Sequence, residues 1–296
     1  MPVPKSPVGA AVSPVGAHVS VAGGLRKSLP RADEVGAEAL QIFLASPRAW
    51  APPPPDPDGD AAFAEALDRP VFVHAPYLIN FGSPSEATLA KSGDALEFSL
   101  RRAAAIGASG VVLHAGSAVL GNRWTDAMAQ VRASVLELLD AVPGVTLLIE
   151  PTAGGGGALA SDAESLAAYL DVLGAHERIG ICLDTCHMHA AGHDMSSVAS
   201  FAAALAQFGA AGRVGLVHVN DSRDPAGSKR DRHEAIGRGT IGVAPFEALF
   251  TSAVTRGVPL IVETADADHA ADIATLRTLR DAAPPVDRLG RPRSIR

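Results

Sequence analysis

The stretch IGICLDTCH, residues 179–187, decides the fold that we predict for this chain. It begins as a continuous apolar run, without the alternation of polar and apolar side chains that a half-exposed strand shows. Such a run is typical of a strand buried on both faces, as in a parallel sheet covered by helices. The run then changes into the polar side chains of Asp184, Cys186 and His187. The stretch therefore predicts a buried strand that delivers polar groups to one end of a sheet.

Stretches of the same kind recur along the whole chain. Segments rich in Ala and Leu with helical spacing separate them, such as 92–108 and 161–174, and the second opens with a Ser-x-x-Glu capping box at Ser161 and Glu164. The predicted strands are VGAHVSV (15–21), ALQIFLA (39–45), PVFVHAPY (70–77), GVVLHAG (110–116), VTLLIEPT (145–152), IGICLDTCH (179–187), VGLVHVND (214–221) and PLIVETA (259–265). Buried strands that alternate with helices in this way predict a single (β/α)8 barrel, the TIM barrel fold.

We expect one catalytic barrel domain with a short segment at each end. A barrel of this kind fills about 250 residues as one domain, and we assign it residues 15–283 of the 296-residue chain. Residues 1–14 are interrupted by prolines and are predicted to be a disordered extension, and residues 284–296 are predicted to be a flexible basic tail. Inside the barrel, the APPPP stretch after Trp50 and residues 222–242 are predicted loops.

Composition limits the cellular setting that we expect. Apolar residues make up 47% of the chain, but no segment approaches the roughly 20 uncharged apolar residues of a membrane span. The start of the chain lacks the continuous apolar centre of a signal peptide. We therefore expect a soluble, cytoplasmic protein with no membrane contact, and a monomer.

The two cysteines, Cys182 and Cys186, are interpreted as small buried residues. Their four-residue offset along the predicted strand would hold them roughly 13 Å apart, which is too far for a disulfide. They also do not form the paired CxxC motifs of zinc knuckles. A redox pair is therefore excluded.

Potential metal ligands stand where the predicted strands end. They are His18, His74, His114, Glu150, Asp184 with His187, His218 and Glu263. The loop after the seventh strand adds Asp231 and His233. A single histidine at a strand end is more often a hydrogen-bonded core residue, but in a barrel all of these positions converge on one mouth, where active sites are built. Burying so many of them costs desolvation energy unless a cation compensates, so the pattern predicts a metal cluster.

Several motifs together carry a resemblance to a known family. They are GAHVSVAGGL (16–25), HAPYLIN (74–80), DTCHMHAAGHD (184–194), HVNDSRDPAGSKRDRHEAIGRGTIG (218–242) and ETAD (263–266). In this order they resemble the motifs of the endonuclease IV family of apurinic/apyrimidinic (AP) endonucleases. The resemblance implies a barrel with three zinc ions, manganese being possible in place of one. It also implies incision of duplex DNA on the 5′ side of an abasic nucleotide, which leaves a 3′ hydroxyl, and removal of 3′ blocking groups.

The resemblance also implies which residues hold each zinc ion. The first ion would be held by His74, His114 and Glu150. The second would be held by Glu150, Asp184, His218 and Glu263. The third would be held by His187, Asp231 and His233. Glu150 would thus join two metals and is the predicted catalytic residue, whereas His189 and His193 have no ligand counterpart. Imidazole and carboxylate donors suit zinc independently of the resemblance.

The chain departs from the family pattern directly after Glu150. The family usually has E-N-T-A-G there, whereas this chain has Pro151 in the sequence EPTAG. Proline lacks the amide side chain and the backbone donor, so a hydrogen bond beside the cluster is expected to be missing or replaced. The glycines at 154–157 lack the Lys-Ser/Thr ending of a P-loop and are interpreted as a flexible loop.

The charge of the whole chain does not resemble that of a DNA-binding protein. The formal net charge is −7 and aromatic residues are 4% of the chain, although three zinc ions would offset most of that charge. Positive side chains that can contact phosphates gather near the predicted mouth, namely Arg48, Lys229, Arg230, Arg232 and Arg238. By resemblance, Arg48, Tyr77 and Leu78 would enter the DNA at the lesion and stabilise the flipped-out sugar.

Two other classes of protein compete with a nuclease. Sugar isomerases and epimerases use the same kind of barrel with His and carboxylate ligands, but typically hold only one or two metals. The additional set of His187, Asp231 and His233 argues against them. A noncatalytic protein that binds damaged DNA would tolerate the loss of ligands, yet every predicted ligand is present.

Overall fold

A closed barrel of parallel strands forms the centre of the molecule. The computed structural model describes residues 12–119, 121 and 123–283. Around the barrel the strand order is β1-β10-β7-β6-β5-β4-β3-β2. These strands are β1 (Val15–His18), β2 (Leu40–Phe43), β3 (Val71–His74), β4 (Gly110–His114), β5 (Thr146–Glu150), β6 (Ile179–Asp184), β7 (Val214–His218) and β10 (Leu260–Val262). The predicted TIM barrel is confirmed.

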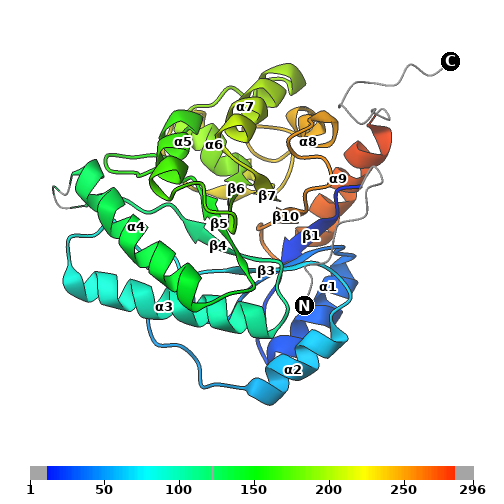
Figure 1. Ribbon diagram of the computed structural model, residues 1–296. Coiled ribbons are helices and arrows are strands. Elements are labelled where there is room, and N and C mark those ends of the chain that lie inside the picture. Colours follow the sequence, from blue (N-terminus) through cyan, green and yellow to red (C-terminus); the bar gives the residue numbers. More distant parts are fainter. Residues whose placement is uncertain (1–11, 120, 122, 284–296) are drawn as a thin grey trace.

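Helices surround the strands (Figure 1). The α-helices are α1 (Ser28–Val35), α2 (Pro57–Ala66), α3 (Glu86–Ala105), α4 (Trp124–Ala141), α5 (Ala163–Val172), α6 (Thr185–Ala191), α7 (Val198–Ala211), α8 (Ala248–Thr251) and α9 (His269–Ala282), with 3-10 turns η1 (Leu25–Lys27) and η2 (Ala244–Glu247). The predicted loop 222–242 contains most of a small antiparallel ladder, which is formed by β8 (Asp221–Ser222) and β9 (His233–Glu234).

The decisive stretch 179–187 is a strand for only part of its length. β6 ends at Asp184, whose Oδ1 accepts a hydrogen bond from the backbone N of His187 at 2.8 Å and caps α6. The prediction of a strand up to His187 is wrong, because an aspartate followed by residues that can form a helical turn ends a strand. Cys186 consequently lies on a helix, so the spacing argument does not apply. Both cysteines are nevertheless buried and free, which confirms the absence of a disulfide.

The capping box of α5 is shifted by one residue from the prediction. Oδ1 of Asp162 accepts from the backbone N of Ser165 at 2.8 Å, and Oγ of Ser165 accepts from the backbone N of Asp162 at 3.2 Å. The predicted pair was Ser161 and Glu164. A serine at the third helical position can close the box as glutamate does, which the Ser-x-x-Glu pattern does not include.

The interior of the barrel is layered. One layer is apolar and consists of Ala39, Phe72, Val112, Leu148, Cys182, Leu216 and Ile261, contributed from around the barrel. Side chains two residues apart on a strand point to the same face. The next layer toward the carboxyl ends therefore holds the residue two positions later on each of these strands. This second layer contains most of the predicted metal ligands.

The chain before β1 is already attached to the barrel. Oγ of Ser13 donates to the carbonyl of Thr255 at 3.2 Å, and the backbone N of Leu260 donates to the carbonyl of Pro14 at 2.8 Å. Ser13 and Pro14 belong to the predicted disordered extension 1–14. Residues 1–11 of that extension lie outside the described part of the chain, and so does the predicted tail 284–296. Among the described helices, none combines the length and the apolar character needed to cross a membrane.

Candidate metal centre

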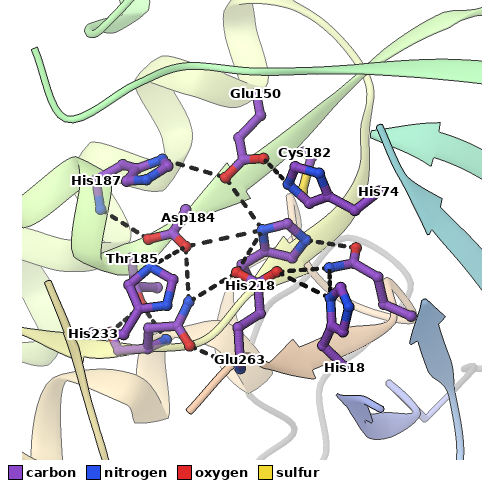
Figure 2. A network of polar contacts seen from close by, with 12 residues as sticks. His18, His74, Glu150, Cys182, Asp184, Thr185, His187, His218, His233 and Glu263 are labelled. Atoms are coloured by element: carbon purple, nitrogen blue, oxygen red, sulfur yellow. Dashed lines mark hydrogen bonds and ion pairs between the residues drawn. The ribbon is translucent and has the colours of Figure 1, made fainter. Parts of the chain in front are cut away.

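Glu150 lies at the centre of a group of histidines at the barrel mouth (Figure 2). Its Oε2 is 3.3 Å from Nε2 of His74 and 3.4 Å from Nε2 of His114. Its Oε1 is 3.2 Å from Nδ1 of His187 and 3.2 Å from Nδ1 of His218. Each of these residues lies at the carboxyl end of a strand or in the helix that follows it, so the barrel itself brings them together. A carboxylate in this position can bridge two cations.

A second group surrounds His218. Its Nδ1 lies 3.2 Å from Oε2 of Glu263 and 3.9 Å from Oδ2 of Asp184. Ligand atoms of these three residues all lie within 4.8 Å of one another. The side-chain amide of Asn220 donates to Asp184 at 2.8 Å and to Glu263 at 3.3 Å, and so holds the two carboxylates.

The third group lies nearer to the surface. Nε2 of His187 is 3.2 Å from Oδ2 of Asp231, and Nε2 of His233 is 3.0 Å from Oδ1 of the same carboxylate. Nε2 of His233 is also 3.6 Å from Oδ2 of Asp184, which connects this group to the deeper ones. The side chain of Asp231 is 46% exposed. This group is therefore the part of the centre that solvent reaches.

The structure brings all nine predicted ligands into one continuous cluster. The predicted second set, without the bridging Glu150, and the predicted third set each form a compact group. The predicted first set is divided between two groups, although His74 and His114 approach the same oxygen of Glu150. One compact group consists of His74, Glu150 and His218, and the other consists of His114, Glu150 and His187.

Electrostatics at the cluster favour bound cations. Burial alone would raise the pKa of Glu150, but His218 and His114 hold it well below its usual value. Burial alone would lower the pKa of His233, but Asp184 and Asp231 raise it to about 9. For His114 burial dominates, and its pKa falls to about 4. The buried carboxylates thus create a negative potential at the centre that favours positive charge, and a cation coordinated by these side chains would supply it.

Two buried ligand atoms lack ordinary hydrogen-bond partners. Within the described residues, Oε2 of Glu150 and Nε2 of His233 make no hydrogen bond, although an imidazole nitrogen of His74 lies near the first and a carboxylate oxygen of Asp231 lies near the second. Buried polar atoms are normally satisfied, so such atoms need another partner. Nitrogen and oxygen donors that converge in this way fit a divalent metal such as zinc.

Cys186 lies at the edge of the cluster. Its Sγ is within 4.8 Å of ligand atoms of Asp184 and His233. Burial, with the charge of Asp184, raises the pKa of its thiol to about 12. The thiol is therefore protonated at neutral pH, and only the thiolate is a strong metal ligand.

A wide hollow adjoins the cluster. It has a volume of about 1030 Å³ and is lined by His114, Tyr77, Leu78, Trp124 and the glycines at 154–157. Gly157 has a φ of 144°, and a Cβ there would lie 2.5 Å from the carbonyl of Ala118, so only glycine fits this wall. The ring of Tyr77 is 48% exposed and stacks on His114 with centroids 5.6 Å apart. The hollow thus gives a large ligand access to the cluster.

The predicted DNA-contacting cations differ in how the protein holds them. Arg48, Lys229 and Arg230 are exposed. Arg232 makes a bidentate contact with Asp224, at 2.6 Å from Nε to Oδ2 and 2.5 Å from Nη2 to Oδ1. Nη1 of Arg230 lies 3.6 Å from the same carboxylate. The carboxylate of Asp224 therefore neutralises part of the charge of this loop.

Comparisons with known proteins identify the family. Residues 29–282 match the family model described as a xylose isomerase-like TIM barrel. A relative from Streptomyces coelicolor, named "Probable endonuclease 4", is 48% identical over 281 residues, which cover 91% of this chain and 96% of the relative. The chain belongs to the endonuclease IV family. The predicted family and the predicted class of enzyme, an endonuclease, are confirmed.

Solved structures agree with this assignment. Endonuclease IV from Thermus thermophilus matches with a TM-score of 0.80 and 32% identity, over 91% of this chain and 100% of that chain. A D-tagatose 3-epimerase-like protein matches with a TM-score of 0.70 but only 18% identity, over 90% of this chain and 98% of that chain. The second likeness shows the fold alone.

Pro151 contacts the cluster of this endonuclease IV family member through its backbone. Its carbonyl lies 3.0 Å from Nδ1 of His187 and accepts a hydrogen bond from it when that nitrogen is protonated. This arrangement leaves Nε2 of His187, which faces Asp231, with its lone pair. Proline retains the carbonyl, so the departure from the family pattern does not remove this contact.

Three further residues support the site and were not found from the sequence. Gln41, Asn220 and Asp221 are all fully buried. Gln41 contacts His218 and Glu263, and Asp221 accepts several backbone hydrogen bonds from the loop that carries Asp231 and His233. A polar residue inside or directly after an apolar strand was the available signal for each of them.

Proposed function

We propose that this enzyme is a zinc-dependent AP endonuclease of base excision repair. It hydrolyses the phosphodiester 5′ to an abasic nucleotide in duplex DNA and leaves a 3′ hydroxyl, and it removes 3′ blocking groups. The observation that carries the proposal is the position of Glu150, whose two oxygens face imidazoles at 3.2 to 3.4 Å in a buried site. Membership of the endonuclease IV family supports it.

Three zinc ions per chain are proposed, with manganese possible in place of one. The ligands are His74, His114, Glu150, Asp184, His187, His218, Asp231, His233 and Glu263. Zinc at such a site lowers the pKa of water and stabilises negative charge on a phosphate. The grouping of these donors and the two unpartnered ligand atoms support the assignment.

The protein's own residues position the substrate in this proposal. The hollow beside His114 accommodates the displaced abasic sugar and the phosphate next to it. Tyr77 and Leu78 line the hollow together with His114. Together with Arg48 they contact the DNA at the lesion, and Lys229, Arg230 and Arg232 contact phosphates. Glu150, buried and surrounded by histidines, would join two of the proposed ions and is the proposed catalytic residue.

One assay tests the reaction directly. A duplex with a single synthetic abasic site is incubated with the protein, and the nick is located on a sequencing gel. We expect incision only on the 5′ side, with an end that a polymerase can extend. A strand that stays intact, together with interconversion of a ketose and an aldose by the same protein, would instead establish a sugar isomerase of the same barrel superfamily.

Metal content tests the cofactor independently of activity. Elemental analysis of protein prepared without chelator is expected to give close to three zinc ions per chain. Activity should persist without added magnesium and should survive brief EDTA treatment, because metals held by several buried ligands leave slowly. Full activity with one metal ion or fewer would refute the trinuclear centre. The monomeric state and the cytoplasmic location stay predictions.

A further inference from the structure

One polar residue in the second layer of the barrel has no assigned role. On most strands, the residue two positions after the one in the apolar layer is a proposed metal ligand. Examples are His74, which follows Phe72, and Glu150, which follows Leu148. On β2 the corresponding position, two residues after Ala39, is Gln41. Its side chain is therefore in the layer of the metal ligands, although an amide is not among the proposed donors.

The amide of Gln41 contacts two proposed ligands. Its Oε1 lies 2.8 Å from Nε2 of His218, and its Nε2 lies 2.6 Å from Oε1 of Glu263. The same amide nitrogen lies 3.0 Å from Nδ1 of His18. The residue is 0% exposed, so water does not compete for these contacts.

Hydrogen-bond chemistry assigns one arrangement to this network. An ionised carboxylate only accepts, so the amide nitrogen of Gln41 donates to Glu263 and the amide oxygen faces His218. That oxygen only accepts, so Nε2 of His218 carries the proton. The lone pair of His218 is then on Nδ1, the atom that faces Glu150, Asp184 and Glu263.

We propose that Gln41 is a positioning residue of the metal centre. It fixes the tautomer of His218 and the orientation of Glu263 at the same time, so that both direct lone pairs at one cation. This inference rests on the proposed metal centre. Groups that orient metal ligands in this way typically change metal affinity by about 10- to 100-fold when they are removed.

Two substitutions separate this role from simple packing. Gln41→Met keeps a similar volume but can neither donate to Glu263 nor accept from His218. Gln41→Glu keeps an oxygen for His218 but loses the donor and adds a negative charge next to Glu263. The matched control is Gln130→Met, since Gln130 is a partly buried glutamine on α4 whose amide donates to the carbonyl of Ser83 at 2.9 Å.

The experiment measures metal release without DNA. Zinc-loaded proteins are mixed with a coloured zinc chelator, and the number and rate of released ions are followed. We expect one class of zinc to leave Gln41→Met about 10- to 100-fold faster than it leaves wild type, with Gln130→Met unchanged. The visible spectrum of the cobalt-substituted protein should change in both Gln41 variants and stay unchanged in Gln130→Met. Gln41→Glu should also release zinc faster than wild type, and it provides the test if Gln41→Met fails to fold.

The inference would be overturned if both Gln41 variants released zinc at the wild-type rate and gave the same cobalt spectrum as wild type. Because release is measured without substrate, this failure is distinguishable from failure of the proposed function. A wild-type protein that binds three zinc ions but does not incise abasic DNA would refute the function and leave the role of Gln41 standing.

Discussion

The metal centre has a deep part and an outer part that are built differently. The deep donors, which stand at the ends of barrel strands, are His74, Glu150, Asp184 and His218, and they are between 0 and 3% exposed. The loop donors, Asp231 and His233, have side chains that are 46% and 24% exposed. Strand pairing fixes the deep donors, because each stands in register with the neighbouring strands. The loop donors depend instead on how their loop is attached.

Asp221 provides part of that attachment, in addition to the β8–β9 ladder in which His233 lies beside Ser222. Its carboxylate accepts hydrogen bonds from the backbone N of Gly237 at 2.9 Å, Gly239 at 3.1 Å, Ile241 at 2.9 Å and Gly242 at 3.2 Å. One buried side chain thus holds the segment that follows the loop donors. The comparison teaches that the same cluster combines donors fixed by the barrel with donors on a loop that is held by the small β8–β9 ladder and by the carboxylate of Asp221.

The largest effect is expected from Glu150→Gln in the deep part. The substitution keeps the shape of the side chain but removes the negative charge between the histidines, so incision should fall on the order of a thousandfold or more. DNA binding should change much less, because the side chains proposed to contact the DNA, such as Arg48 and Arg230, are not among the proposed metal ligands. Single-turnover incision and gel mobility with the abasic duplex measure the two effects.

Glu137→Gln is the matched control, since Glu137 is an exposed carboxylate on α4. It should leave both measurements unchanged. Incision by Glu150→Gln at near wild-type speed would contradict the assignment of Glu150 as the bridging ligand, even though the family is established.

A smaller and more selective effect is expected from Asp221→Ala. The backbone donors of the loop lose their acceptor, so Asp231 and His233 should move while the deep donors stay in place. We expect zinc content to fall from three ions toward two, with incision reduced about 10- to 100-fold. Elemental analysis and the incision assay check this, with Asp140→Ala on α4 as an exposed control. Equal loss of all three ions would show that the two parts do not form independently.

The smallest effect is expected at the rim of the loop. Removing one phosphate contact should weaken DNA binding severalfold. It should also make the decrease of the logarithm of the binding constant with the logarithm of the salt concentration less steep, by about one unit of slope. Arg230→Ala should show this effect more strongly than Arg232→Ala, because Asp224 already neutralises Arg232. Binding titrations at several salt concentrations make the comparison. A larger loss for Arg232→Ala would indicate that the contact with Asp224 opens when DNA binds.

The deep part could be predicted from the sequence more fully than the outer part. Continuous apolar runs followed by residues such as His74 or Glu150 define both the strands and the side chains at their ends, because the barrel forces those ends together. Residues 185–187 were predicted wrongly, since nothing in the apolar run shows that Asp184 accepts a hydrogen bond from His187 and starts a helix.

The supporting residues were hidden for a different reason. The partners of Gln41 lie on β7 and after β10, far along the chain, and those of Asp221 are backbone groups of residues 237–242. Hydrogen bonds between such distant positions depend on the tertiary fold and leave no local pattern. The bidentate contact between Arg232 and Asp224 spans only eight residues, but it depends on how the loop folds back on itself, which the sequence pattern does not show.

Closure of the barrel between its first and last strands also determines when the centre can form during synthesis. β1 pairs with β10, with Val15 beside Leu260, and Glu263 follows directly after β10. A growing chain therefore carries every other proposed donor out of the ribosome before it completes the set. The proposed set of metal ligands is therefore complete only once the final strand has been made. A prematurely terminated chain that ends before Glu263 accordingly lacks one proposed ligand and cannot close the barrel.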